Sequence, residues 1–146
     1  MSIKAFVEKV LTDKSSNLQK IELGKVTDAE IEFLKETVSL DLTDYCRVLD
    51  NSGICHAFKK HGDAKIEAQR GQIAITPDDF ENILELVQNP DFVAYVGKNR
   101  IGNDLILYEK TFEEVLCYVE GLRESKKKHR KEAYLETLYK KKPSKD

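Results

Sequence analysis

Hydrophobic residues in the first 40 positions recur at the spacing of amphipathic helices. The apolar positions of the N-terminal segment are Ile3, Phe6, Val7, Val10 and Leu11. Steps of three and four residues place such side chains on one face, so residues 2–12 are predicted to form a helix. Thr27 followed by Glu30 is a capping box, which predicts that a second helix begins there. The apolar residues of its inner face are Ile31, Leu34 and Val38.

The chain between and after these helices is less regular. The polar stretch 15–25 is predicted to be a loop, and residues 42–60 are predicted to form a third helix. Asn51, Ser52 and Gly53 interrupt its apolar pattern, so two short helices with a turn between them are an alternative. Gly62 follows the end of this segment, where a left-handed helix cap favours glycine.

The spacing of apolar residues changes after residue 72, and it indicates several strands and one further helix. Thr76 and Pro77, followed by acidic residues, predict a helix start, and Asn89-Pro90 predicts its end. The buried stripe of this helix is expected to be Phe80, Ile83, Leu84 and Val87. Segments rich in β-branched or aromatic residues predict strands at 92–96, 105–109, 115–119 and 134–139, with a short apolar run at 72–75. The expected fold is therefore α+β, with N-terminal helices packed on a C-terminal antiparallel β-sheet of four to five strands.

Charge is distributed unevenly along the chain. The 146 residues carry 24 basic and 26 acidic side chains, but residues 121–146 alone carry 10 basic and 4 acidic ones. A basic C-terminal quarter on an acidic body favours a local surface for an anion, because charge attraction is screened beyond about 10 Å. A solvated Lys-rich end explains the same pattern equally well.

Several classes of function are disfavoured by what the sequence contains. A hydrophobic fraction of 40% fits a globular chain, and no apolar run approaches the roughly 18 residues of a membrane helix. The N-terminus does not resemble a secretory signal, so a cytoplasmic location is expected. Cys46, Cys55 and Cys117 show no metal or redox spacing, and they are expected to be reduced thiols. Glycine-rich phosphate loops and zinc motifs are absent, so neither metal nor cofactor is expected.

A group of titratable residues lies in the predicted third helix. His56, Lys59, Lys60 and His61 fall within six positions, and i+3 and i+4 residues share a helix face. Neighbouring cations lower the pKa of an imidazole, so His56 could act as a base. A surface histidine pair at a helix end is the alternative interpretation.

The predicted strands offer a second group. Tyr108 and Lys110 are two positions apart, as are Thr137 and Tyr139, so each pair lies on one face of its strand. On neighbouring strands these pairs would form a polar, cationic platform suited to a phosphodiester. Each pair could equally be ordinary surface. His129 lies in a Lys-rich turn, where it could contact phosphate or simply be solvated.

An ordered series of motifs resembles the phage-associated branch of the barnase, EndoU, colicin E5/D and RelE-like nuclease superfamily. The series comprises His56-Ala-Phe-Lys-Lys-His-Gly62, Glu67-Ala-Gln-Arg-Gly-Gln-Ile-Ala-Ile-Thr-Pro-Asp-Asp-Phe80, residues 83–91, Tyr108-Glu-Lys110 and Thr137-Leu-Tyr-Lys-Lys141. The resemblance covers residues 42–142. It implies a nuclease domain over that range, an N-terminal helical extension at 1–41 and a basic tail at 143–146.

The resemblance also implies a metal-independent endoribonuclease of the toxin or phage-conflict type. Such enzymes cleave RNA, with tRNA as one candidate, by attack of the 2′-hydroxyl that leaves a 2′,3′-cyclic phosphate. The residues assigned to catalysis are His56, Lys59, His61, Tyr108, Lys110, Thr137 and Tyr139. The residues assigned to substrate binding are Arg70, Lys98, Lys126, Lys128, His129, Arg130 and Lys140. His56 is the leading acid/base, and Lys59 stabilises phosphate or lowers the pKa of the imidazole.

A toxin of this kind would need an acidic antitoxin or immunity protein as its partner, because complementary charge speeds association. The alternative is a non-catalytic RNA- or protein-binding module of a phage or mobile-element protein, since function does not follow from fold alone.

Overall fold

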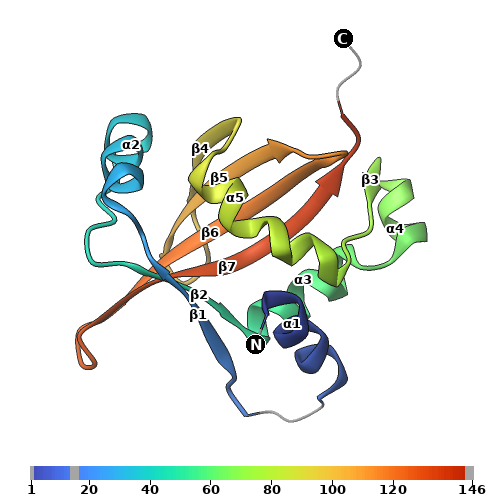
Figure 1. Ribbon diagram of the computed structural model, residues 1–146, viewed down its shortest axis with the longest axis horizontal. Coiled ribbons are helices and arrows are strands. Elements are labelled where there is room, and N and C mark those ends of the chain that lie inside the picture. Colours follow the sequence, from blue (N-terminus) through green and yellow to red (C-terminus); the bar gives the residue numbers. More distant parts are fainter. Residues whose placement is uncertain (1, 14–16, 144–146) are drawn as a thin grey trace.

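The first half of the chain alternates helices and strands. The computed structural model describes residues 2–13 and 17–143 (Figure 1). The elements of this half are α1 (Ile3–Thr12), β1 (Lys20–Lys25), α2 (Asp28–Val38), β2 (Cys46–Asp50), α3 (Asn51–His61) and α4 (Ala64–Gln69). The helices predicted at 2–12 and from Thr27 are confirmed, and Thr27 and Glu30 make both hydrogen bonds of a capping box.

The second half forms most of the sheet. Its elements are β3 (Gln72–Ile73), the 3₁₀ helix η1 (Pro77–Asn82), α5 (Ile83–Gln88), β4 (Phe92–Lys98), β5 (Asp104–Thr111), β6 (Val115–Ser125) and β7 (Arg130–Lys141). The strand order is β1-β2-β7-β6-β5-β4, and β3 also pairs with β7. The α+β class and the mostly antiparallel C-terminal sheet are confirmed. The two N-terminal strands extend that sheet beyond the predicted segments.

The loop predicted at 15–25 is wrong over its second part, and Ser15 and Ser16 lie outside the described residues. β1 pairs antiparallel with β2, and its Ile21 and Leu23 pack against the core. β1 is the first strand in the sheet order, so polar residues such as Glu22 can face solvent. The alternation of only two apolar residues was too short a signal for a strand.

The single helix predicted at 42–60 is also wrong. Its first part is β2, which pairs in parallel with β7, and Val48 and Leu49 are fully buried. A strand buried on both faces reads as a continuous apolar run, which periodicity cannot separate from a helix. Asn51 begins α3, and Asp50 caps the helix by accepting a hydrogen bond from the Gly53 amide at 2.7 Å. The left-handed cap predicted at Gly62 is wrong, because its φ is −96°.

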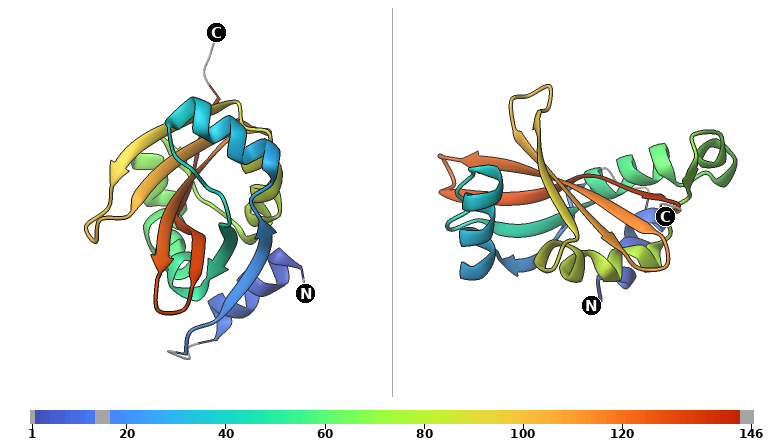
Figure 2. Two further views of the ribbon diagram at one scale, coloured as in Figure 1. Left: turned by 90° about the vertical axis from the view of Figure 1, so that its left-hand side faces the viewer. Right: turned by 90° about the horizontal axis from the view of Figure 1, so that it is seen from above.

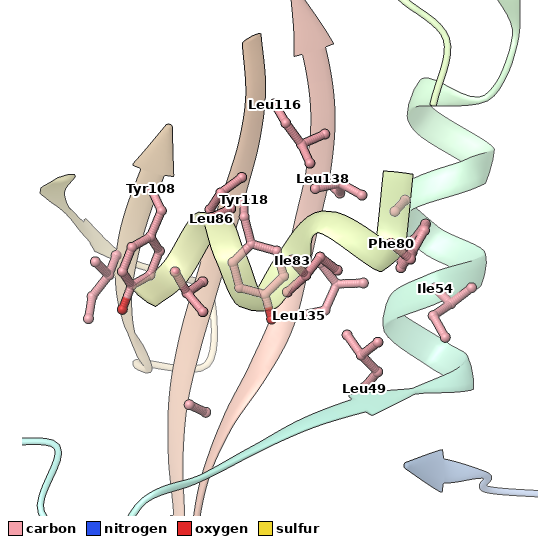
Figure 3. Close-up of a cluster of buried hydrophobic side chains, with 14 of the residues drawn as sticks. Leu49, Ile54, Phe80, Ile83, Leu86, Tyr108, Leu116, Tyr118, Leu135 and Leu138 are labelled. Carbon is pink, nitrogen blue, oxygen red and sulfur yellow. The ribbon is translucent and has the colours of Figure 1, made fainter. Parts of the chain in front are cut away.

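The segment predicted as one helix after Pro77 has two parts, η1 and α5. They lie across one face of the sheet, and Leu86, not Leu84, is among the fully buried residues of α5 (Figure 3). The side chains that meet there include Phe80, Ile83, Leu86, Tyr108, Leu116, Tyr118, Leu135 and Leu138. Phe6, Val7 and Val10 of α1 belong to the same buried cluster. The N-terminal helix therefore shares the core of the C-terminal sheet.

A buried ion cluster joins α2, β2, β5 and β6 within this core. Arg47 donates from Nη1 to Glu30 Oε1 at 2.6 Å and from Nε to Glu120 Oε2 at 2.7 Å. Tyr108 donates from Oη to Glu120 Oε1 at 2.8 Å. Burial alone would lower the pKa of Arg47, but Glu120 and Glu30 raise it well above its usual value, so the guanidinium stays charged.

The side of β7 that faces away from β6 is covered by α3. α3 lies against β7 at the edge between β2 and β3, and a Cβ at Gly53 would come within 2.6 Å of the Leu135 carbonyl oxygen. In the right-hand view of Figure 2, α1 and α5 lie on one side of the sheet, and the β4–β5 hairpin rises on the opposite side.

Two core tyrosines differ in the hydrogen bonding of their hydroxyl groups, so removal of the hydroxyl should change the free energy of unfolding differently in each. The Tyr118 hydroxyl is buried and has no hydrogen-bond partner among the described residues, whereas the Tyr108 hydroxyl donates to Glu120. Tyr118→Phe should leave the free energy of unfolding unchanged or raise it by about 1 kcal/mol. Tyr108→Phe should lower it by about 1–3 kcal/mol, because a buried carboxylate loses a donor. Urea denaturation of both variants measures this difference, and equal losses would contradict it.

Candidate functional site

An open groove of about 830 Å³ lies on the face of the sheet opposite α5. Its walls come from α3 on one side and the β4–β5 hairpin on the other, and strands β5, β6 and β7 supply its floor. α3 contributes His56 and Lys60, and the hairpin contributes Lys98, Asn99, Arg100, Ile101 and Asn103. The floor residues are Leu105, Arg123, Tyr134 and Glu136. A smaller hollow beside Asp50 and Ser52 shares His56, Arg123, Tyr134 and Glu136 with the groove.

Tyr134 lies flat across the neighbouring strand because Gly121 leaves space for it. Gly121 is opposite Tyr134 in the β6–β7 register, and a Cβ there would lie 2.3 Å from Tyr134 Cζ. The phenol oxygen accepts hydrogen bonds from Asn99 Nδ2 and Asn103 Nδ2, both at 2.9 Å. The ring is thus held by a strand beneath it and a hairpin at its end.

Arg123 is positioned over this ring by two carboxylates. Its guanidinium carbon lies 4.6 Å from the Tyr134 ring centroid, a cation–π arrangement. Nη2 donates to Asp50 Oδ2 at 3.3 Å, and Nε donates to Glu132 Oε1 at 3.1 Å. Burial would raise the pKa of Glu132, but hydrogen bonds from Lys20 and Arg123 outweigh it, so its pKa is lowered and it is ionised at neutral pH. Arg123 remains 37% exposed, so it can still meet an anion in the groove.

His56 and Glu136 reach the groove through two local features. Asp50 caps α3 with one carboxylate oxygen and binds Arg123 with the other, which couples the helix that carries His56 to β6. Glu136 is the extra residue of a β-bulge, since Val119 pairs with Thr137 and Glu120 pairs with Leu135. Bulges redirect side chains and are frequent beside functional sites. The groove therefore combines an imidazole, a carboxylate and several cations.

The platform predicted from Tyr108, Lys110, Thr137 and Tyr139 is wrong in its geometry. β6 separates β5 from β7, and the register aligns Tyr108 with Tyr118 and Leu138, on the core face. Tyr108 is fully buried. Lys110 donates to the Asn89 carbonyl oxygen at 2.7 Å. Thr137 and Tyr139 alternate with core-facing Leu138, so they lie on the opposite face.

Thr137 and Tyr139 lie outside the lining of the groove. The Thr137 hydroxyl is buried and has no hydrogen-bond partner among the described residues. Burial raises the pKa of Tyr139 to about 12, with a smaller contribution from Cys117. The Tyr139 ring packs against His61 rather than lining the groove, with 5.5 Å between the two ring centroids.

His61 belongs to a separate, half-buried cluster. Its Nδ1 lies 3.1 Å from Oε2 of Glu67, which is fully buried. Glu67 also accepts a hydrogen bond from Arg70 Nη1 at 3.1 Å, and Arg70 Nη1 donates to the Lys60 carbonyl oxygen at 3.0 Å. These contacts join α3 to α4. Both histidines of α3 were assigned to catalysis from sequence. The structure brings His56 into the groove and places His61 against α4.

The remaining predicted cations are dispersed. Lys59 is exposed on α3 outside the groove lining, and Lys140 binds Asp79 at 3.1 Å with only 11% of its side chain exposed. Lys98 lines the groove and binds Asp104 at 2.9 Å. Lys126, Lys128, His129 and Arg130 lie at the β6–β7 turn, where Lys128 and Arg130 line a third hollow that also includes Arg123. The turn thus adjoins the groove through Arg123.

Sequence reasoning missed Tyr134, Arg123 and Glu136 as groove residues. One signal was available, because Gly121 lies inside the run of strand residues Val115–Ser125, and glycine in a strand interior often marks close approach of other groups. The bulge at Glu136 has no comparable signature. Across the described residues, 2–13 and 17–143, no group of three or more His, Cys, Asp or Glu side chains could hold a metal ion. No helix in this part of the chain is both long and apolar enough to cross a bilayer.

One comparison with known proteins identified a family. A family model described as phage-Barnase-EndoU-ColicinE5/D-RelE like nuclease3 matches residues 14–146. No curated protein and no solved structure matches the chain. The match begins 28 residues before the range of the sequence resemblance, and the added residues include β1 and α2.

The contact between Gly121 and Tyr134 predicts a stability coupling. Gly121→Ala should lower the free energy of unfolding by about 1–3 kcal/mol, because its methyl group would overlap the ring. In a Tyr134→Ala background the same substitution should cost less than about 0.5 kcal/mol, since the obstacle is gone. Urea denaturation of the two single variants and the double variant measures the coupling. An equal cost in both backgrounds would mean that the ring does not depend on the glycine.

Proposed function

The chain belongs to the phage-Barnase-EndoU-ColicinE5/D-RelE like nuclease family, and on this premise we propose that it is a metal-independent endoribonuclease. The observation that carries the proposal is the groove in which His56, Glu136 and Arg123 lie together. An imidazole and a carboxylate can exchange protons with a substrate, and a guanidinium can bind phosphate.

The proposed reaction transfers the phosphoryl group of a phosphodiester from the 5′-oxygen to the neighbouring 2′-hydroxyl. The 2′-oxygen forms a bond to phosphorus and gives its proton to a base, while the bond from phosphorus to the 5′-oxygen breaks. An acid protonates the leaving 5′-oxygen, and the products are a 2′,3′-cyclic phosphate and a 5′-hydroxyl. We assign the base and acid to the pair Glu136 and His56, and His56 keeps the acid/base role assigned from sequence.

Arg123 is proposed to stabilise the negative charge that develops on the phosphoryl oxygens. It suits this role because Asp50, Glu132 and the Tyr134 ring already hold it in place, so little reorganisation is needed during reaction. Lys60, Lys98 and Arg100 line the same groove and would attract the RNA backbone. The β6–β7 turn, with Lys128 and Arg130, would extend this attraction beyond the groove.

The other residues assigned from sequence are proposed to act indirectly. Tyr108 would hold Glu120 in the core, and His61 with Tyr139 would fix the end of α3. Lys59 would add to the positive potential along the helix. The substrate is proposed to be RNA in the bacterial cytoplasm, with tRNA as a candidate, and the activity to be that of a toxin or phage-conflict protein.

An acidic antitoxin or immunity protein is proposed to inhibit the enzyme by covering the groove. Support for this partner comes from the cations that line it, because complementary charge speeds association and excludes wrong partners. The same surface would be closed to RNA in the complex.

The test is incubation of the wild-type protein with total bacterial RNA in excess EDTA, followed by mapping of the cleaved ends. We expect discrete fragments that end in 2′,3′-cyclic phosphate. His56→Ala and Glu136→Gln should each lower the cleavage rate by about 10²-fold or more. Cys55→Ala is the matched control, because Cys55 is exposed on the same helix outside the groove lining and should retain full activity.

Two outcomes would contradict the proposal. Full activity in His56→Ala would remove the imidazole from the mechanism. Intact RNA with folded wild-type protein would contradict ribonuclease activity and favour the RNA- or protein-binding module. Binding in that case should weaken in graded, salt-dependent steps as basic residues are replaced.

A further inference from the structure

We propose that the hydroxyl group of Tyr134 donates a hydrogen bond to a nonbridging oxygen of the phosphate in the groove. This makes Tyr134 a further catalytic residue of the proposed reaction, and the inference rests on that function. Sequence reasoning placed Tyr134 only in a predicted strand.

The Tyr134 oxygen already accepts two hydrogen bonds. Asn99 and Asn103 each donate from Nδ2 at 2.9 Å. A hydroxyl offers one proton and two lone pairs, so both accepting positions are occupied. Within the described residues, no acceptor for the Tyr134 proton is present in the hydrogen-bond network. The proton is therefore the one unused position of this group.

The orientation of Asn99 is fixed by its own loop. Its Oδ1 accepts from the backbone N–H groups of Ile101, at 3.1 Å, and Asn103, at 3.0 Å. The side-chain carbonyl cannot turn toward Tyr134 without losing both bonds, so the amide nitrogen must face the phenol. The β4–β5 loop thus presents a donor, not an acceptor, to the ring.

The ring itself has little freedom to turn away. Gly121 lies beneath it, Arg123 lies over it, and only 7% of the residue is exposed. Tyr134 nevertheless lines both the groove and the smaller hollow that contains His56. A donor held by its surroundings costs no reorganisation when charge develops on a phosphoryl oxygen.

The Tyr134 hydroxyl and the Arg123 guanidinium would act on the same phosphate. Arg123 supplies charge, and Tyr134 supplies a neutral O–H donor, whose hydrogen bond to an anionic oxygen is about twice as strong as one between neutral groups. No proton is transferred in this role. Tyr134 stabilises the transition state while His56 and Glu136 move the protons.

Three variants test the proposal by single-turnover cleavage of an RNA oligonucleotide in EDTA. Tyr134→Phe keeps the ring and removes the donor, and it should slow cleavage by about 10- to 100-fold. Its affinity for a 2′-O-methyl RNA, which cannot be cleaved, should stay within about threefold, since the donor acts mainly on the transition state. Asn103→Asp places an obligate acceptor beside the phenol, draws the proton away from the groove, and should slow cleavage to a similar degree.

The double variant Tyr134→Phe with Asn103→Asp separates this effect from simple charge repulsion. If Asn103→Asp acts by capturing the proton, the double variant should cleave as fast as Tyr134→Phe, within about threefold. A double variant that is about tenfold slower than Tyr134→Phe would assign the Asn103→Asp effect to charge, and would overturn the proposed orientation. Full activity in Asn103→Asp would mean that Asn103 already accepts the proton in the wild type, which also overturns it.

His56→Ala distinguishes failure of this inference from failure of the proposed function. Equal cleavage by the wild type and Tyr134→Phe, with none by His56→Ala, would refute the role of Tyr134 alone. Absence of cleavage by folded wild-type protein would refute the ribonuclease function and the Tyr134 donor with it.

Discussion

The arrangement of the sheet depends on the buried ion pairs of Arg47 with Glu30 and Glu120. The Arg47 guanidinium neutralises Glu30 from α2 and Glu120 from β6, and Tyr108 from β5 shares Glu120. Glu30 also closes the capping box of α2, so one carboxylate both starts a helix and binds the sheet. Removing one partner would leave an uncompensated buried charge, which typically costs about 3–5 kcal/mol. The N-terminal elements are thus bound to the sheet by charge as well as by apolar contact.

The two faces of the sheet carry different side chains because residues alternate along each strand. Tyr108 and Glu120 point toward α5 into the core, while Arg123 and Tyr134 belong to the groove. The register shift between Val119 and Glu120 is caused by one extra residue in β7. It sets Glu136 apart as an unpaired position of β7. Leu135 and Leu138, although three positions apart, therefore both face the core, and the Glu136 carboxylate lies at the groove.

The groove is held by a chain of contacts that begins at Asp50. This residue caps α3, which carries His56, and it binds Arg123, which stacks on Tyr134. Tyr134 in turn receives two amide donors from the β4–β5 loop. Contacts between these residues thereby order four separate segments around one space. Such preorganisation is what electrostatic stabilisation of a transition state requires.

Local sequence patterns were enough to predict the α+β class, the helices α1 and α2, the C-terminal strands and the nuclease family, because these follow from periodicity, capping residues and ordered motifs. The sequence did not determine that β1 and β2 are strands, since a short edge strand and a strand buried on both faces lack the usual alternation. Nor did it determine which polar residues meet. Tyr108 and Tyr134 both lie in predicted strands, yet strand order, register and a bulge send one into the core and the other to the groove. Those pairings connect distant segments, so only the tertiary structure could decide them.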